Sequence, residues 1–184
     1  MPEDKPSGDI HGLAGPVSEA FWSPDFVMQS IEILPVLLRD GTIWSFTPEH
    51  ADSFMVAWPA QSQPEDIAVK AAKHLGLDTV VLHSTSWRHV DKEVVLTYIA
   101  VVSPDTTAPE FWKLEEVGRA ELARGGATAP PSSIGVSQVV EHALRHLAWL
   151  RKDDPVIRDL LADWAPALED YVPEPFRSFA GPPV

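Results

Sequence analysis

The sequence predicts an α/β or α+β domain, because segments typical of β-strands alternate with amphipathic segments typical of helices. Thr42–Phe46 alternates as a half-buried strand does, and Glu93–Val102 is apolar almost throughout. Helical periodicity appears in Gln61–Leu77 and again in a segment that begins near Val136. With 184 residues, the chain is long enough for one domain with a substantial hydrophobic core.

Charge and composition exclude several functional classes. The formal net charge is −13, from 27 acidic and 14 basic residues, and no basic run is present, so we expect no nucleic-acid polymer and no anionic membrane as partner. The absence of cysteine excludes disulfides, thiolate zinc sites and cysteine nucleophiles. The N-terminus, MPEDKPSGDI, lacks the basic and apolar regions of a secretory signal, and no apolar run is long enough to span a bilayer. We therefore expect a cytoplasmic protein.

The N-terminal part predicts an arm followed by a β-hairpin. Residues 1–28 are rich in proline, glycine and charge, which is typical of a poorly ordered arm. Residues 29–38 have a strand pattern, but Pro35 interrupts it and predicts an edge strand or a bulge. A turn at residues 39–41 leads to the strand at residues 42–46, and a further short strand at residues 54–58 ends at Pro59.

The helix predicted within Gln61–Leu77 has a clear start and a clear stop. Pro64 and two acidic residues fall in its first turn, and Gly76 follows its last apolar residue. The apolar positions Ile67, Ala68, Ala71, Ala72 and Leu75 fall on one face.

The next segments predict a strand, a polar connection and a buried strand. Residues 79–83 have a strand pattern, residues 84–92 are polar, and residues 93–102 are apolar enough to be a central strand buried on both faces. Residues 111–117 predict a short strand that passes into a helical turn, and residues 118–133 form a long loop.

The C-terminal part predicts helices. Residues 136–147 repeat apolar side chains at helical spacing, and Asp154 with Pro155 predicts the start of a further helix. That helix carries Ile157, Leu160, Leu161, Trp164 and Leu168 on one side, and Pro166 bends or ends it. We thus divide the chain into an arm (1–28), a main domain (29–152), and a C-terminal helix with a proline-rich tail packed on that domain (153–184).

The order of elements resembles the Nudix family over roughly Ile33–Leu150. The resemblance consists of a hairpin, the Trp58-Pro59-Ala60 turn, an amphipathic helix that ends in Leu-Gly-Leu, and a following strand. It implies a mixed β-sheet between helices, with the last helix of this chain as an addition. When Gly76 and Leu77 are aligned with the end of the family motif G-x5-E-x7-R-E-U-x-E-E-x-G-U, the R-E-U-x-E-E positions fall on residues 69–74.

None of the motif's carboxylates is present in that alignment. The positions hold Val69, Lys70, Ala71, Ala72, Lys73 and His74, and the upstream glutamate falls on Gln61. In the family these carboxylates hold Mg²⁺ or Mn²⁺, which polarises a diphosphate for attack by water. Lysine ammonium groups do not coordinate such ions, so we expect no cofactor. Mg²⁺ or Mn²⁺ enters only if other carboxylates form a relocated site. The candidates are Glu49, Asp52, Glu65, Asp66, Asp91, Glu93, Glu115 and Glu116, and the last two directly precede the long loop.

Lys70, Lys73 and His74 share one helix face and are the leading ligand-binding candidates. One hypothesis is that the two ammonium groups replace the metal and hold an anionic ligand, since lysine binds phosphate as a point charge. The alternative is an ordinary solvated face. If a pocket lies beside this face, we expect Trp58, Glu115 and Glu116 among its walls.

The remaining histidines favour no site. His142 and His146 have the i, i+4 spacing of zinc ligands, but no third ligand is indicated and His142 is expected on the solvent side. His83 and His89 flank a serine-containing segment, yet no nucleophile elbow or phosphate-binding glycine loop is present. We therefore expect no catalytic residue and no metal site at these positions.

Three functional classes stay open on the sequence alone. The leading prediction is a catalytically deficient protein of Nudix-like fold that binds a small ligand, nucleotide-like or phosphorylated, or a protein partner. One alternative is a hydrolase of nucleoside diphosphate derivatives with relocated carboxylates. Another is a structural or interaction protein, with a second copy of the chain among its partners.

Overall fold

A computed structural model describes residues 28–59, 61–90, 93–122 and 134–173. The predicted arm at residues 1–28 lies outside them apart from Met28, and so do residues 123–133 of the long loop and the tail from residue 174. The elements in chain order are β1 (Met28–Arg39), β2 (Thr42–Pro48), β3 (Phe54–Ala57), α1 (Pro64–His74), β4 (Thr79–Val90), β5 (Glu93–Val102), β6 (Trp112–Glu116), α2 (Val136–Asp153), α3 (Pro155–Leu160) and the 3₁₀ turn η3 (Ala162–Trp164). Within the described chain, no helix combines the length and the apolar character needed to cross a membrane.

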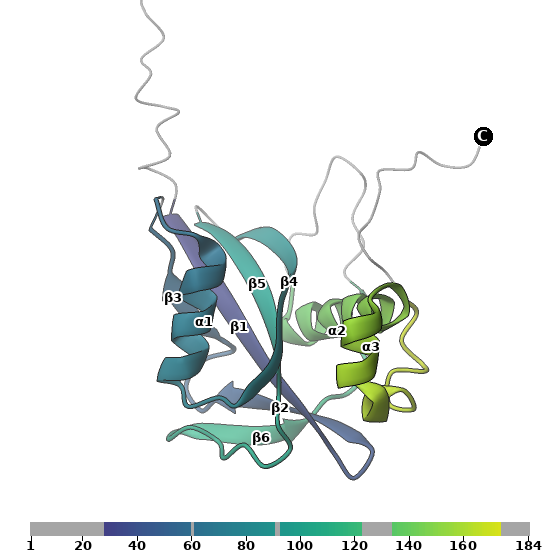
Figure 1. The fold of residues 1–184 in the computed structure, drawn as a ribbon. Helices are drawn as coiled ribbons and strands as arrows, with labels where there is room; N and C mark the ends of the chain where they lie inside the picture. The colour runs from purple at the N-terminus through teal and green to yellow at the C-terminus, as the bar shows by residue number, and fades with distance from the viewer. Residues whose placement is uncertain (1–27, 60, 91–92, 123–133, 174–184) are drawn as a thin grey trace, which may run out of the picture.

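The six strands of the described chain form one mixed sheet in the order β4-β5-β1-β2-β6, with β3 paired to β1. β1 and β5 are parallel, and the other pairs are antiparallel. Figure 1 shows α1 on one face of this sheet and α2 with α3 on the other. The predicted mixed α/β architecture, with a sheet between helices and a further C-terminal helix, is therefore confirmed.

The sheet separates two hydrophobic cores. On the face that α2 and α3 cover, called the α2 face here, β1 contributes Leu34 and Val36, which pack with Leu144 and Leu147. On the opposite α1 face, the alternate residues of β1 pack with the small side chains Ala68, Ala71 and Ala72 of α1. This division follows from strand alternation, because successive side chains of β1 point to opposite faces.

Pro35 does not make β1 an edge strand, so that prediction is wrong. β1 is continuous over 12 residues and lies in the middle of the sheet. Its β3 register ends at Ile33 and its β2 register begins at Val36, so Pro35 falls between two partners. The Pro35 carbonyl accepts a hydrogen bond from Ser45 Oγ at 3.1 Å on the side of β2. In a strand, the nitrogen and the carbonyl of one residue point to the same side. The Pro35 nitrogen therefore points to the place where the pairing with β3 has ended and the pairing with β2 has not begun, so no hydrogen bond of the sheet is lost there.

The predicted turn at residues 39–41 and the α1 stop are confirmed. Asp40 and Gly41 both have positive φ, at 51° and 77°, as a two-residue hairpin loop of type I′ requires. Gly76 has φ +69° directly after α1. The Gly76 N–H donates to the Lys73 carbonyl and the Leu77 N–H donates to the Ala72 carbonyl, both at 3.0 Å. These two bonds are the Schellman arrangement, which ends a helix at a glycine.

Residues 84–90 were predicted as part of a polar connection, and that prediction is wrong. β4 continues to Val90 and pairs with β5 through Val90↔Glu93, with a register shift between Ser84 and Ser86. The strand is polar because it is an edge strand, so backbone pairing on one side is enough to hold it. The prediction that β5 is central is confirmed.

Two smaller predictions near the C-terminal half also need correction. Residues 115–116 belong to strand β6 and not to a helical turn, because Glu115 and Glu116 pair with Ser45 and Trp44. The predicted capping of α3 is confirmed, since Asp154 Oδ1 accepts hydrogen bonds from the N–H groups of Val156 and Ile157. Leu160, predicted on the buried side of α3, is exposed, whereas Leu161 is buried.

Candidate functional site

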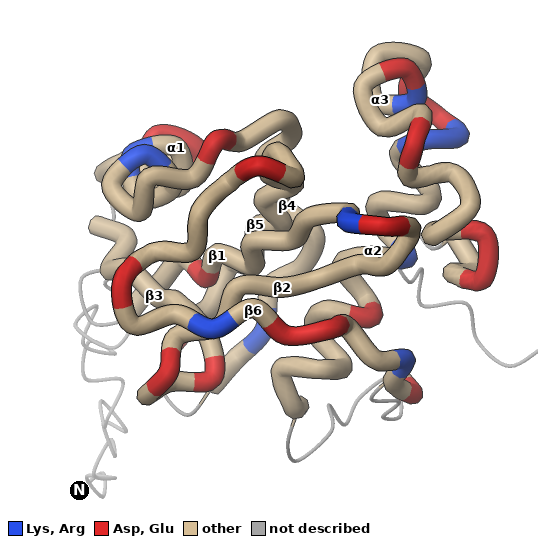
Figure 2. The backbone as a smooth tube through the Cα atoms, turned by 90° about the horizontal axis from the view of Figure 1, so that it is seen from below, with Lys and Arg blue, Asp and Glu red and all other residues tan. Residues whose placement is uncertain are grey.

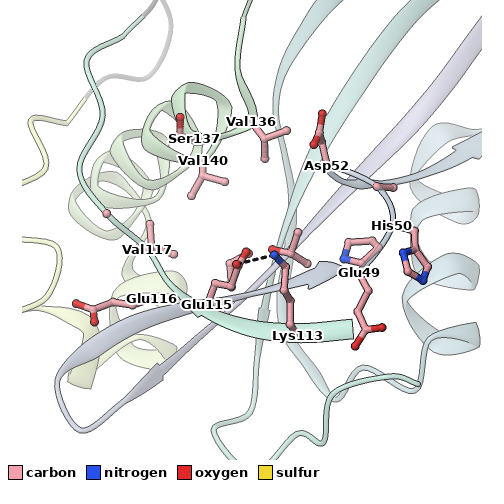
Figure 3. Close-up of a pocket in the computed structure, with 15 residues that line it drawn as sticks. Glu49, His50, Asp52, Lys113, Glu115, Glu116, Val117, Val136, Ser137 and Val140 are labelled. Carbon is pink, nitrogen blue, oxygen red and sulfur yellow. Dashed lines mark ion pairs between the residues drawn. The ribbon is translucent and has the colours of Figure 1, made fainter. Parts of the chain in front are cut away.

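A cavity of about 560 Å³ opens on the α2 face of the sheet. β2, β6, the segment that joins β2 to β3, and the first turns of α2 surround it (Figure 3). Its polar lining residues are Ser45, Thr47, Glu49, His50, Asp52, Lys113, Glu115, Glu116 and Ser137, and its apolar ones include Pro48, Val117, Val136 and Val140. A cavity of this size with converging polar groups is the usual form of a small-molecule site.

Strand alternation explains which side chains reach the cavity. Ser45 pairs with Glu115, and Thr47 pairs with Lys113, so these four residues share the α2 face. Glu116 pairs with Trp44 and therefore belongs to the opposite face, and Figure 3 shows its carboxylate turned away from Lys113 and Glu115. The cavity thus receives Lys113 and Glu115 from β6, whereas Glu116 contributes at its border.

The cavity is acidic. Lys113 Nζ and a Glu115 carboxylate oxygen lie 2.7 Å apart, with side chains 50% and 48% exposed. Glu49, Asp52 and Glu116 add three further carboxylates to the lining, and Lys113 is the one lysine among the lining residues that the structure describes. Such an exposed ion pair contributes little to stability, so both groups stay available to a ligand.

The segment that follows β2 is held in place from two sides. The Glu49 N–H donates to the Phe111 carbonyl at 2.8 Å, which fixes the start of this segment against the residue before β6. At its other end, Ser53 Oγ donates to Glu32 Oε1 at 2.6 Å. Asp52 lies next to Ser53, so the acidic rim of the cavity rests on a fixed backbone.

Glu32 is the centre of a buried polar network beside this rim. Its side chain is 0% exposed in central strand β1, and Arg88 donates to both of its oxygens at 2.7 and 2.8 Å. Thr97 Oγ1 donates to Glu32 Oε2 at 2.8 Å. Burial by itself raises the pKa of Glu32, but the hydrogen bonds from Arg88, Ser53 and Thr97 and the charge of Arg88 outweigh it, so the pKa lies below its usual range.

A second buried carboxylate fixes the wall formed by Val117 and Gly118. Glu141 of α2 accepts hydrogen bonds from Arg119 Nε and Nη2 at 3.0 and 2.9 Å, and from Arg145 Nε at 2.8 Å. Burial alone raises the pKa of Glu141, but the hydrogen bonds from both arginines and from the Ala120 N–H lower it on balance. The segment after β6 is therefore tied to α2 next to the cavity.

The structure does not bring the predicted ligand-binding residues together. Lys70, Lys73 and His74 are exposed on α1, on the far side of the sheet from the cavity, and within the described chain neither lysine forms an ion pair. Trp58 packs against the α1-face core, and its Nε1 donates to the Ser62 carbonyl at 2.8 Å. Only Glu115 and Glu116 line the cavity. Ligand binding by the α1 residues stays a prediction.

The residues on α1 do not fit the metal that the resemblance implies. Lys70, Lys73 and His74 project into solvent, and Ala71 and Ala72 are buried against the sheet. None of these side chains supplies a carboxylate oxygen, which is the ligand that Mg²⁺ and Mn²⁺ prefer. In the parts of the chain that the structure describes, no three His, Cys, Asp or Glu side chains are grouped so as to hold a metal ion.

The two histidines of α2 are less exposed than the predicted solvent-side position of His142 implies. His146 is buried, and its ring stacks on the ring of His83 with centroids 5.2 Å apart. His142 is half-buried. The neighbouring Glu141 is also buried, and the ion pairs with Arg119 and Arg145 offset the cost of burying its charge.

Sequence reasoning missed Lys113, Thr47 and Ser137 as cavity residues. The alternation of Lys113 and Glu115 along β6 was a usable signal, because residues two apart on a strand share a face. Ser137 carried no such signal, since its place in the cavity depends on how α2 docks on the sheet.

The comparisons with known proteins identify neither a family nor an activity for this chain. No protein-family model and no curated protein matches the sequence. Similar solved structures include Shewanella oneidensis NrtR, with TM-score 0.45 and 9% identity over 67% of this chain and 65% of that one. A chain in the complex between the C-terminal domain of mouse MUTYH and human PCNA gives TM-score 0.38 and 15% identity, over 48% of this chain and 72% of the other. The E. coli ORF135 protein gives TM-score 0.30 and 19% identity, over 48% of this chain and 72% of that one.

Proposed function

We propose that this protein binds a small molecule in the cavity between β2, β6 and α2 and does not carry out the metal-dependent hydrolysis that the family resemblance implies. The cavity carries this proposal. Its volume of about 560 Å³ suits a drug-sized or metabolite-sized ligand, and its polar groups converge from four segments of the chain.

The lack of hydrolysis is supported by the side chains present on α1. Lys70, Lys73 and His74 stand where the family motif has carboxylates, and the two lysine ammonium groups repel a divalent cation. We therefore favour binding without turnover over metal-dependent hydrolysis.

The test is a thermal-shift screen of small molecules against the wild-type protein and a variant with a filled cavity. Thr47→Trp places a large ring at a half-buried cavity position and should abolish the shift. Thr42→Trp is the matched control, because Thr42 is half-buried on the same strand but does not line the cavity. A shift that survives in Thr47→Trp would place the ligand elsewhere and contradict the proposal.

The hydrolase remains a second candidate because Glu49, Asp52, Glu115 and Glu116 line one cavity. Product release from nucleotide sugars, dinucleotides and nucleoside triphosphates, measured with Mg²⁺ and with Mn²⁺, distinguishes the two. Sustained turnover that requires the metal and is lost in Glu115→Gln supports the hydrolase. Self-association in sedimentation without any ligand shift supports an interaction protein instead.

A further inference from the structure

We infer that the ligand of this cavity is a small organic cation, carrying an ammonium or guanidinium group, and not a phosphate-bearing molecule. This inference rests on the proposed function, since it names the chemical class of the ligand for the same cavity. It departs from the sequence-based expectation of a nucleotide-like or phosphorylated ligand, and the reason is the charge of the lining.

Carboxylates outnumber cations around the cavity. Glu49 and Asp52 come from the segment after β2, and Glu115 comes from β6. Among the described residues that line the cavity, Lys113 is the one lysine and there is no arginine. Figure 3 shows the Lys113 ammonium beside the Glu115 carboxylate, with Glu49 and Asp52 on the side away from Glu116. Even when Glu116 is left out because it turns away, the lining carries a net negative charge. A phosphate would therefore enter against repulsion, and an organic cation would be attracted.

The start of α2 does not reverse this balance. Its first turn contains no acidic residue, and a helix N-terminus carries about half a positive charge. One of its N–H groups is already used, because the Gly135 N–H donates to Gln138 Oε1 at 3.0 Å. The half charge of the helix N-terminus and the full charge of Lys113 together do not balance the three negative charges of Glu49, Asp52 and Glu115.

Lys113 also shows how a cation fits the site. Its ammonium lies 2.7 Å from a Glu115 oxygen, so this carboxylate already accepts a primary amine in the cavity. Both side chains are about half exposed, at 50% and 48%, and an exposed pair of this kind is weak and exchanges readily. A ligand ammonium can replace Lys113 at Glu115, with Asp52 and the hydroxyl of Thr47 as further acceptors.

This arrangement makes opposite predictions for the two charges of the pair. Lys113→Gln removes the competing ammonium, so the Kd of an organic cation should fall by about fivefold, whereas that of an anion should rise. Glu115→Gln should raise the Kd of the cation by about the same factor. The probes are agmatine and spermidine as cations, and ADP-ribose and inorganic phosphate as anions, measured by calorimetry with the full chain at low ionic strength.

A surface ion pair outside the cavity supplies matched controls. Arg158 and Asp159 on α3 lie 3.6 Å apart and do not line the cavity. Arg158→Gln and Asp159→Asn change the net charge by the same amounts as the two test variants and should leave every Kd within twofold. An equal effect of these controls would mean that only the overall charge of the protein acts, and it would overturn the inference.

The outcomes separate the inference from the proposed function. If phosphate-bearing probes bind, Lys113→Gln weakens them and Thr47→Trp abolishes them, the cavity is a ligand site but the ligand class is wrong. If no probe binds the wild-type protein, or if binding is unchanged in Thr47→Trp, these probes do not bind in the cavity. Both the proposed binding function and the inferred ligand class are then contradicted. Cation binding that strengthens in Lys113→Gln and weakens in Glu115→Gln is the expected result.

Discussion

At the scale of single residues, the unusual feature is a pair of carboxylates buried in a protein that has few cations. Glu32 and Glu141 each have a 0% exposed side chain, and each is held by arginine. An isolated buried carboxylate would be very unfavourable, so these sites are sustained by guanidinium groups that donate two parallel hydrogen bonds. Arg88 and Arg119 therefore have structural roles that a count of charges could not indicate.

Removal of Arg88 should destabilise the fold strongly. Arg88→Met keeps the length of the side chain but leaves the Glu32 carboxylate buried without its counter-ion, which costs about 3–5 kcal/mol. The free energy of unfolding from urea denaturation measures this loss. Arg158→Met is the control, since Arg158 is 56% exposed and its loss should change the free energy of unfolding by about 0.5 kcal/mol or less. A similar small loss for Arg88→Met would mean that Glu32 does not depend on this ion pair.

The lowered pKa of Glu32 predicts a loss of stability in acid. Burial raises this pKa, but the hydrogen bonds from Arg88, Ser53 and Thr97 hold it below that of an unfolded-state glutamate, about 4.3. The Glu32 contribution to stability is therefore complete above about pH 4.3 and is lost as the pH falls through the lower folded-state pKa. Urea denaturation from pH 7 to pH 3 should show the wild-type protein more stable than Glu32→Gln at neutral pH, with a difference that narrows in acid. Parallel curves for the two proteins would contradict the assignment.

Residue patterns could predict part of the cavity and none of the buried network. Glu115 was a candidate because it precedes the long loop, and its partner Lys113 follows from strand alternation. Glu32 and Arg88 are 56 residues apart in the sequence and meet only because β1 and β4 are both neighbours of β5. Contacts of this kind depend on sheet order, which periodicity along one strand does not contain.

At the scale of elements, local chemistry predicted the helices and turns better than the strands. α1 begins at a proline and is followed by a glycine with positive φ. Both signals depend only on residues at the helix ends, so they can be recognised in the sequence. The extent of β4 could not be predicted, since its polar second half is held by backbone pairing with β5. The prediction that β1 is an edge strand was also wrong, because Pro35 lies between the end of the β3 pairing and the start of the β2 pairing.

A substitution at Gly76 tests whether the positive φ at this position requires glycine. Gly76 has φ +69° and no atom within 4 Å of an added Cβ, so Gly76→Ala introduces backbone strain without a clash. The left-handed conformation costs an alanine about 1–2 kcal/mol, which should appear as a lower free energy of unfolding. Gly118 also has open space around an added Cβ but no positive φ, so Gly118→Ala should be neutral within about 0.5 kcal/mol. Equal effects of the two substitutions would show that φ is not the cause.

At the scale of the whole molecule, the segment after β6 joins several parts of the α2 side of the sheet. Figure 2 shows acidic residues spread over most elements, with fewer basic ones between them. Arg119 is where three parts of the α2 side come together. It donates to Glu141 of α2, its Nη1 donates to the Asp170 carbonyl at 3.0 Å, and its guanidinium lies 4.1 Å from the centroid of the Tyr171 ring.

This geometry predicts that Arg119 holds the C-terminal turns onto α2. Arg119→Lys keeps the positive charge but cannot donate from a planar fork to Glu141 while it also contacts Asp170 and Tyr171. The side chain is 45% exposed, so the expected loss is moderate, about 1–2 kcal/mol. Amide hydrogen exchange should accelerate in residues 161–171 and stay unchanged in α1, because α1 belongs to the core on the other face of the sheet.

The control for this prediction is again Arg158, whose ion pair in the described chain is with an exposed carboxylate on its own helix. Arg158→Lys should leave exchange unchanged in both regions. Uniform acceleration across α1 and residues 161–171 in Arg119→Lys would mean that the two cores open together and that Arg119 stabilises the whole sheet. Acceleration confined to the C-terminal turns would instead show that they detach as a separate unit while the rest of the α2-face core stays closed.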